Sequence, residues 1–391
     1  MMKKICIVTA TRAEYGLLCP LIRRVWQDPE LELLLAVTGA HLDSRYGNTK
    51  TEIEKDGIPI DTCIPILEAG DGKEAISKVI ANAVSRFTVY FEERSPDMVV
   101  LLGDRYETLG IALAAMVCQI PISHIHGGET TEGAIDEAIR HAITKMSYLH
   151  FTACSEYRKR VIQLGENPNR VYNVGALGVE NIKTLPLLSR EETGKQIGFS
   201  LENPYALITF HPVTLENQTQ GEQIKELFAA LEQFPELQLI FTKSNADSGG
   251  LEINELIDEY VAQNPKRSIA FFSMGYLRYL SAMKTCSMVI GNSSSGILEA
   301  PAMRVPTIDI GDRQKGRLAA DSVIHSETDR NSIATAIRKA RSPEFHQICE
   351  TVVNPFGDGH TSEKIVAAIK RNLTDGITLK KPFYNVDFSI K

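Results

Sequence analysis

The sequence has no apolar run approaching the roughly 20 residues that a membrane-spanning helix needs. Its basic start, Met-Met-Lys-Lys, is followed by the short and mostly apolar run 5–10 before charged residues resume. Because the apolar core of a secretion signal is longer than this, the stretch predicts a first buried strand. We therefore expect neither a membrane anchor nor a membrane partner.

Positive charge is also scarce, since Lys and Arg number 42 against 49 Asp and Glu, for a formal net charge of −7. No nucleic-acid partner is expected, because nucleic-acid-binding domains carry a basic excess, but a local basic pocket for a phosphorylated small molecule is allowed. The seven cysteines are scattered and form no C-x-x-C pair. This pattern indicates reduced, mostly buried thiols in a cytoplasmic protein.

Strand-like apolar runs alternate with helix-like segments along almost all of the 391 residues, which predicts parallel sheets wrapped by helices in two domains. The expected strands include 4–10, 33–38, 98–102, 120–126, 150–153, 206–210, 237–242, 269–272, 288–290 and 306–310. We expect an N-terminal domain over residues 1–178, a C-terminal domain over 179–372 and a tail over 373–391, with a linker at 175–204. The last helix, 359–372, could return across the linker to pack on the N-terminal domain.

Ligands of open parallel sheets bind outside the carboxyl ends of the strands, and in two-domain proteins usually in the cleft between the domains. The first such end, 9–16, lacks the G-x-G-x-x-G of dinucleotide folds, so NAD is not expected. Arg12 lies instead where a phosphate would sit at a helix start, although a surface arginine beside a cap is an equal alternative.

Later strand ends in the first half are rich in acidic residues. Asp104 follows an apolar strand, where it is either a helix cap or a functional carboxylate. The segment His124-Ile-His-Gly-Gly-Glu129 then leads to Asp136. Several carboxylates at a glycine-lined corner indicate acid/base chemistry, although an exposed i, i+4 pair between Asp136 and Arg140 is the alternative.

A metal site is the other alternative for this corner. By the two-residue period of a strand, His124 and His126 would lie on one face, beside Glu129. Zinc sites of this kind need a further ligand, and the sequence offers none at a suitable spacing. We therefore expect no metal.

Polar residues also follow the strands of the second half. His211 lies at a strand tip stopped by Pro212, and the basic segment 309–317 follows a later strand. The run Gly291-Asn-Ser-Ser-Ser-Gly296 ends another strand, with a helix expected after Gly296. Backbone N–H groups and hydroxyls there could cradle a diphosphate, while Glu299 could accept hydrogen bonds from a ribose diol. The expected ligand is a substituted nucleoside diphosphate.

Seven segments, taken in order, identify a family. They are 11–15, 46–49, 103–105, 124–129 with 135–145, 211–214, 291–296 and 312–314. Together they closely resemble the hydrolysing UDP-N-acetylglucosamine 2-epimerases of sialic acid synthesis. The resemblance implies a GT-B fold, an α/β protein of two Rossmann-like domains with UDP in the cleft between them. It further implies a homo-oligomer, dimer or tetramer, that needs no cofactor.

The resemblance also implies a reaction, UDP-N-acetylglucosamine and water giving N-acetylmannosamine and UDP. Elimination of UDP would give a 2-acetamidoglucal, which is then hydrated. The implied catalytic residues are Asp104, Glu129, Asp136 and His211. The implied UDP-sugar ligands are Arg12, Arg105, His126, His211, Asn245, Ser273, Met274, Ser293, Ser294, Ser295, Gly296, Glu299 and Arg313, with the backbone around Ser273 and Met274 contacting uracil.

Two positions depart from the family pattern. His126 replaces a glutamate found in non-hydrolysing and several hydrolysing members, and Gly16 replaces a frequent serine. The pattern with His126 is also similar to a branch acting on UDP-2,4-diacetamido-2,4,6-trideoxyglucose in the legionaminic acid route, which is the alternative substrate. A nucleotide-sugar glycosyltransferase and a non-catalytic UDP-sugar-binding regulator remain as rival classes.

Overall fold

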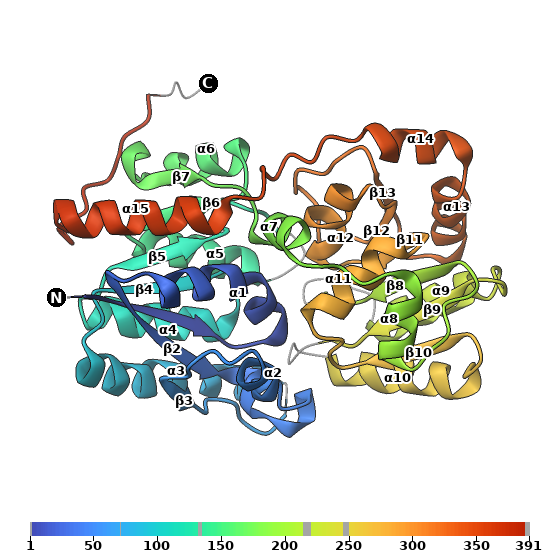
Figure 1. The fold of residues 1–391 in the computed structure, drawn as a ribbon, viewed down its shortest axis with the longest axis horizontal. Helices are drawn as coiled ribbons and strands as arrows, with labels where there is room; N and C mark the ends of the chain where they lie inside the picture. Colours follow the sequence, from blue (N-terminus) through green and yellow to red (C-terminus); the bar gives the residue numbers. More distant parts are fainter. Residues whose placement is uncertain (1, 71, 132–134, 214–219, 245–249, 388–391) are drawn as a thin grey trace. The chain divides into compact units, whose positions relative to one another are not determined.

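The computed structural model describes residues 2–70, 72–131, 135–213, 220–244 and 250–387. The chain divides into two compact units. Unit 1 comprises Met1–Glu129, Asp136–Glu180 and Phe356–Lys391, and unit 2 comprises Thr130–Ile135 and Asn181–Pro355. Each unit is a parallel sheet with helices on its faces (Figure 1). In the described ranges, no helix has both the length and the apolar character needed to cross a membrane.

Unit 1 contains a seven-stranded parallel sheet of order β3-β2-β1-β4-β5-β6-β7. Its strands are β1 Lys3–Thr9, β2 Leu31–Thr38, β3 Thr62–Ile64, β4 Met98–Leu102, β5 Ile122–Ile125, β6 Leu149–Thr152 and β7 Val171–Asn173. Its helices are α1 Arg12–Gln27, α2 Lys50–Lys55, α3 Lys73–Arg94, α4 Tyr106–Val117, α5 Asp136–Met146, α6 Ser155–Gln163 and α15 Thr361–Asp375, with short 3₁₀ turns η1 Gly39–Leu42, η2 Ser44–Tyr46 and η3 Pro168–Arg170. Helix α7, Leu177–Thr184, contains the boundary with unit 2.

Unit 2 contains a six-stranded parallel sheet of order β10-β9-β8-β11-β12-β13. Its strands are β8 Tyr205–Thr209, β9 Gln238–Thr242, β10 Ser268–Phe271, β11 Met288–Gly291, β12 Thr307–Ile310 and β13 Val323–Ser326. Its helices are α8 Arg190–Ile197, α9 Gln220–Leu231, α10 Gly250–Gln263, α11 Tyr276–Thr285, α12 Ser294–Leu298, α13 Arg330–Ala340 and α14 Pro343–Thr351, with the 3₁₀ turn η4 Ala300–Met303.

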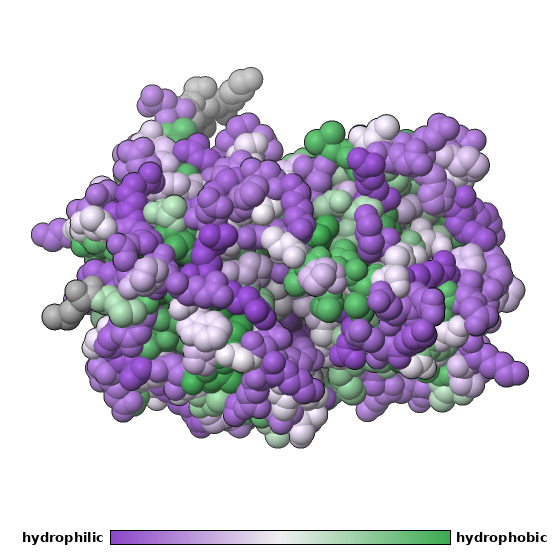
Figure 2. All heavy atoms as spheres, in the orientation of Figure 1, coloured by the Kyte–Doolittle hydropathy of each residue, from purple (hydrophilic) through white to green (hydrophobic). Residues whose placement is uncertain are grey.

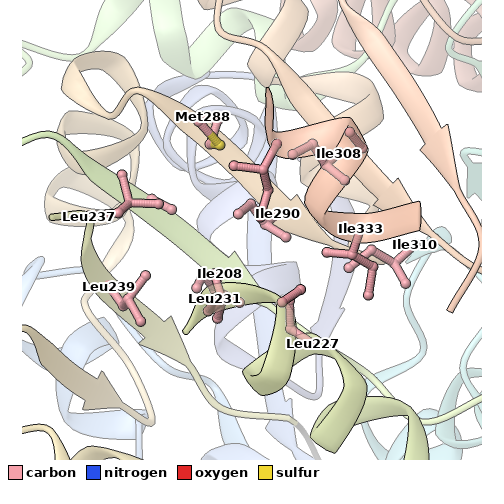
Figure 3. Close-up of a cluster of buried hydrophobic side chains, with 14 of the residues drawn as sticks. Ile208, Leu227, Leu231, Leu237, Leu239, Met288, Ile290, Ile308, Ile310 and Ile333 are labelled. Carbon is pink, nitrogen blue, oxygen red and sulfur yellow. The ribbon is translucent and has the colours of Figure 1, made fainter. Parts of the chain in front are cut away.

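The central strands are continuous apolar runs because both of their faces are covered by helices. All five residues of β4 are buried, for example, as are all five of β8. Figure 3 shows how Ile208, Ile290 and Ile308, from three neighbouring strands of unit 2, meet Leu227 of α9 and Ile333 of α13 in one apolar cluster. Figure 2 shows a mainly hydrophilic face with small apolar groups, as expected when the apolar runs are inside.

The prediction of two parallel α/β domains is confirmed, and the differences lie at the edges. Strands β3, β7 and β13 were not predicted, because each is a short edge strand with only one buried residue. The expected linker 175–204 instead contains α7 and α8. Helix α8 begins at a capping box in which Ser189 and Glu192 satisfy each other's backbone N–H groups.

The last helix, α15, belongs to unit 1. It packs against α1, where Arg24 donates a hydrogen bond to Ser362 at 3.1 Å and Lys370 pairs with Asp28 at 3.0 Å. Its apolar face adds Ile365, Val366, Ala368 and Ile369 to the core of that unit.

Gly291 ends β11 and begins the serine-rich loop, residues 291–296, and its close packing against β8 can be tested by substitution. Its φ is +134°, and an added Cβ would overlap the carbonyl oxygen of Thr209 on β8. We expect Gly291→Ala to destabilise the protein by about 1–3 kcal/mol, measured as a lower thermal midpoint. Gly72→Ala is the control, since its backbone is extended and the added Cβ would meet no described atom within 4 Å. Equal midpoints for the two variants would contradict this account.

Candidate active site

A buried arginine organises the acidic residues of unit 1. Arg140, in α5, is 1% exposed, and its guanidinium pairs with the carboxylates of Asp104 and Glu137, the latter at 2.7 Å. It also donates to the carbonyl oxygen of Glu129 at 2.9 Å. Burial alone would lower the pKa of Arg140, but the charges of Asp104, Glu129 and Glu137 outweigh burial and raise it. The arginine therefore stays charged and brings the segments after β4 and β5 together with the start of α5.

These contacts decide between the alternatives left by the sequence. The N-cap of α4 is Arg105, which makes no side-chain capping bond, and the carboxylate of Asp104 binds Arg140. The alternative of a solvent-exposed pair of Asp136 with Arg140 does not hold, because the side chain of Arg140 is buried, and its guanidinium pairs with Glu137. Asp136 is half-buried at the first position of α5. Arg140 itself was missed as a site residue, although its position four residues after Asp136 was visible.

His124, in β5, and His126, just after it, have different environments. The prediction that they share one strand face is wrong, because β5 ends at Ile125 and His126 adopts a left-handed φ of +66°. His126 Nδ1 lies 3.3 Å from the carboxylate of Glu129. His124 is fully buried, donates from Nε2 to the carbonyl of Gly103 at 2.7 Å, and has its pKa lowered by burial to about 3. His124 is therefore a neutral structural residue.

The turn between these residues is constrained by its two glycines. An added Cβ at Gly127 would lie 3.1 Å from His124 Nδ1 and from Thr144, and one at Gly128 would overlap the carbonyl of Tyr157. The turn therefore holds His126 and Glu129 close together. Within the described residues, no group of three or more His, Cys, Asp or Glu could hold a metal ion.

A second charged cluster lies at the starts of α1 and α4. Arg105 contacts Glu107 at 3.2 Å, and the side chain of Glu107 is fully buried. Glu14 forms a capping box with Thr11, and burial together with the charge of Glu107 raises the pKa of Glu14 to about 7, against the opposing effect of Arg105. Arg12 is the first residue of α1. Sequence reasoning missed Glu14 and Glu107 because their burial depends on tertiary packing.

In unit 2, Asn292 joins the segments that follow β8, β11 and β12. It is fully buried, accepts from the backbone N–H of His211 at 2.7 Å and donates back to the carbonyl of His211 at 2.8 Å. The backbone carbonyl of Asn292 accepts from the side chains of Arg313 at 2.9 Å and Gln314 at 2.7 Å. The ring of His211 also lies 3.1 Å from the hydroxyl of Ser244. Asn292 thus brings His211 and Arg313 next to the serine-rich loop.

The serine-rich loop differs in detail from the prediction. The helix begins at Ser294 and contains Gly296, because Ser293 is the N-cap and accepts from the N–H of Ser295. Gly296 is needed for close packing, since an added Cβ would lie 2.7 Å from the methyl group of Thr307. With five residues, α12 has only a weak dipole, so hydroxyls and N–H groups matter more there. Glu299, at its C-terminal end, is 4% exposed.

The remaining predicted ligands follow β10 and β9. Ser273 accepts a hydrogen bond from the N–H of Gly275 at 3.0 Å, and Met274 is buried in an apolar cluster with Leu280. Asn245 lies outside the described residues.

Comparison with known proteins places the chain in a family. The family model for UDP-N-acetylglucosamine 2-epimerase matches residues 23–370. The chain belongs to this family. The resemblance drawn from the sequence is confirmed, and with it an enzyme of the UDP-sugar 2-epimerase type.

Two relatives and one solved structure illustrate the similarity. The chain is 43% identical to GDP/UDP-N,N'-diacetylbacillosamine 2-epimerase (hydrolyzing) of Campylobacter jejuni, covering 98% of this chain and 99% of the relative. It is 36% identical to UDP-N,N'-diacetylbacillosamine 2-epimerase (hydrolyzing) of Legionella pneumophila, covering 95% and 96%. A crystal structure of UDP-GlcNAc 2-epimerase from Neisseria meningitidis, bound to UDP-GlcNAc, has a TM-score of 0.78 at 19% identity, covering 94% and 100%. Structural similarity of this kind confirms the GT-B-like fold class.

For this 2-epimerase family member we expect Arg140→Lys to lower kcat about 100-fold, because an ammonium ion cannot reproduce the planar fork that positions Asp104 and Glu137. Steady-state kinetics with a UDP-sugar substrate would measure it. Arg23→Lys is the control, as its side chain is 46% exposed and lies 3.7 Å from Asp56, a contact of little energetic value. Equal kcat in both variants would show that Arg140 does not position the acids.

Proposed function

We propose that the chain is a hydrolysing UDP-sugar 2-epimerase whose substrate is UDP-N,N'-diacetylbacillosamine, the UDP-2,4-diacetamido-2,4,6-trideoxyglucose kept above as the alternative. The products are UDP and the free 2-epimeric sugar. The observation that carries the choice of sugar is the near full-length identity of 43% and 36% to two relatives named for it. The main expectation, UDP-N-acetylglucosamine, has less support and becomes the second candidate.

The proposed reaction has two steps. A base removes the proton from C2 of the sugar while the bond from C1 to the diphosphate oxygen breaks, so that UDP leaves and a C1–C2 double bond forms. Water then adds its oxygen at C1, and a proton is delivered to C2 on the opposite face. Proton removal and return on opposite faces require at least two titratable groups.

Unit 1 supports these proton transfers. The buried Arg140 pairs with the carboxylate of Asp104 and holds it at the end of β4, where it is a candidate base. The paired His126 and Glu129 offer an imidazole beside a carboxylate, with His126 Nδ1 3.3 Å from a carboxylate oxygen. Asp136, at the start of the helix that carries Arg140, is the third candidate. Arg105 is proposed as a sugar ligand.

Unit 2 supports binding of the departing UDP. The guanidinium of Arg313 and the ring of His211, whose backbone is held by Asn292, would meet the diphosphate together with the hydroxyls and N–H groups of Ser293–Ser295. Glu299 would accept hydrogen bonds from the ribose, and the segment at Ser273 and Met274 would contact uracil. Arg12 remains a predicted phosphate ligand, and Asn245 remains predicted near the diphosphate.

The expected cellular location and oligomeric state are kept as proposals. All seven cysteines are unpaired, which supports a reducing, cytoplasmic location. We also propose a homo-oligomer, dimer or tetramer, that uses neither metal nor cofactor and acts in a nonulosonic acid route.

Incubation with UDP-sugar in D₂O, without any acceptor, tests the reaction and the sugar together. We expect UDP and a free 2-epimeric sugar with one deuterium at C2, because the returning proton comes from solvent. We expect kcat/KM for UDP-N,N'-diacetylbacillosamine to exceed that for UDP-N-acetylglucosamine at least tenfold, since this ratio measures discrimination. Nuclear magnetic resonance of the product measures the label.

Each contrary result has a separate meaning. A product without deuterium at C2 would rule out elimination and re-addition through exchangeable groups. A preference for UDP-N-acetylglucosamine would restore the second candidate. Turnover only after an acceptor is added would indicate a glycosyltransferase, and UDP-sugar binding without turnover would indicate a regulator.

Variants of the acidic residues separate chemistry from binding. We expect Asp104→Asn, Glu129→Gln and Asp136→Asn each to lower kcat by about 10²–10⁴, the usual contribution of general acid/base catalysis, with UDP affinity nearly unchanged. Glu299→Ala is the matched control, expected to weaken UDP binding by about 1–3 kcal/mol. Calorimetry with UDP and steady-state kinetics provide the two measurements. Unchanged kcat in all three acidic variants would remove them from the mechanism.

A further inference from the structure

In helix α5 the proposed functional residues all lie in the N-terminal half. Its N-terminal half holds Asp136, Glu137 and the buried Arg140, so the placement of this helix sets the placement of the acids. The helix is 11 residues long and ends at Met146, where the last carbonyl groups lack partners within the helix. Ser147 donates to the carbonyls of Ile143, from its hydroxyl at 2.7 Å, and Thr144, from its N–H at 3.1 Å, whereas the carbonyl of Lys145 takes its donor from a distant segment.

The donor, Lys381, belongs to the tail, which here means residues 376–387 after α15. Lys381 Nζ donates to the carbonyl oxygens of Lys145 at 2.8 Å and Ser147 at 2.7 Å, and it pairs with the carboxylate of Glu166 at 2.8 Å. These three acceptors use all three N–H groups of the ammonium. A cation is also favourable at the C-terminal end of a helix. Lys381 therefore caps α5 from more than 230 residues away.

Glu166 ties this cap to the sheet. Its side chain is fully buried and contacts Lys145 of α5 at 2.6 Å and His150 of β6 at 3.1 Å. Burial alone would raise the pKa of Glu166, but the hydrogen bonds from His150, Lys145 and Lys381 outweigh it and lower the pKa to about 2. The carboxylate is therefore ionised throughout the neutral range, and it connects the tail, α5 and β6.

The tail is seated by further contacts at the turn after α6. The N–H of Tyr384 donates to the carbonyl of Gly165 at 2.8 Å, and Lys145 Nζ lies 4.9 Å above the ring of Phe383. An added Cβ at Gly165 would overlap that ring, so only glycine leaves room for it. In Figure 1 the tail is the red segment that leaves α15 and runs to the C-terminus. Its path is thus fixed by specific contacts.

We propose that Lys381 is a positioning residue for catalysis, which acts through the C-terminal end of α5 to hold Asp136, Glu137 and Arg140 in place. This inference rests on the proposed function for the effect on turnover. The structural part of the inference, that the tail holds α5 in place, does not depend on the substrate.

Lys381→Met tests the proposal, with Lys380→Met as the matched control because Lys380 is exposed. We expect Lys381→Met to lower kcat about 10- to 100-fold while the Kd for UDP changes less than twofold, since small displacements of reacting groups have effects of this size. Hydrogen exchange should become faster in the peptide 136–147. Lys381→Arg, which keeps the charge and the donors, should recover most of the lost kcat.

Phe383→Ala is a second variant, which loosens the tail but keeps every charge, for use if Lys381→Met does not fold. It should show faster exchange in 136–147 and a smaller loss of kcat. Wild-type exchange and kcat in the folded variants would overturn the proposal, and so would a change in UDP affinity equal to the change in kcat. If the wild-type enzyme turns over neither UDP-sugar, the proposed function fails, while the exchange measurements still decide whether the tail holds α5.

Discussion

A buried guanidinium needs anionic partners, and this requirement arranges the acids of unit 1. Arg140 is almost completely inaccessible, so its charge is tolerable only with acceptors on several sides. They come from Asp104 after β4, the carbonyl of Glu129 after β5, and Glu137 on its own helix. The ends of two neighbouring strands and the start of α5 are thereby fixed to one side chain, so the positions of the proposed acid/base groups depend on it.

In unit 2 a neutral residue, Asn292, joins the segments that follow three strands. The amide of Asn292 exchanges two hydrogen bonds with the backbone of His211, while its own carbonyl accepts from Arg313 and Gln314. The neutral Asn292 brings no charge of its own beside Arg313. The positive Arg140 of unit 1 instead holds two carboxylates, those of Asp104 and Glu137. Under the proposed function, Asn292 holds proposed ligands of the diphosphate and Arg140 holds proposed acid/base residues.

The alternation of the sequence was sufficient to predict the sheets, because central parallel strands must be apolar on both faces. It also located Asp104, Glu129, His211 and the serine-rich loop, since the ends of parallel strands lie on one edge of a sheet. It did not show Arg140 as an organising residue, because its partners come from distant positions and an isolated arginine is usually exposed. The left-handed backbone of His126 was equally hidden, since the period-two pattern of a strand assumes an extended backbone.

The return of α15 to unit 1 has a consequence for synthesis on the ribosome. Unit 2 is formed almost entirely by one continuous stretch, whereas unit 1 needs residues from both ends of the chain. Until residues 361–375 emerge, the surface of α1 that receives Ile365 and Ile369 has no native cover. Unit 2 can therefore complete its fold first, and the earliest part of the chain to be made is the last to be finished.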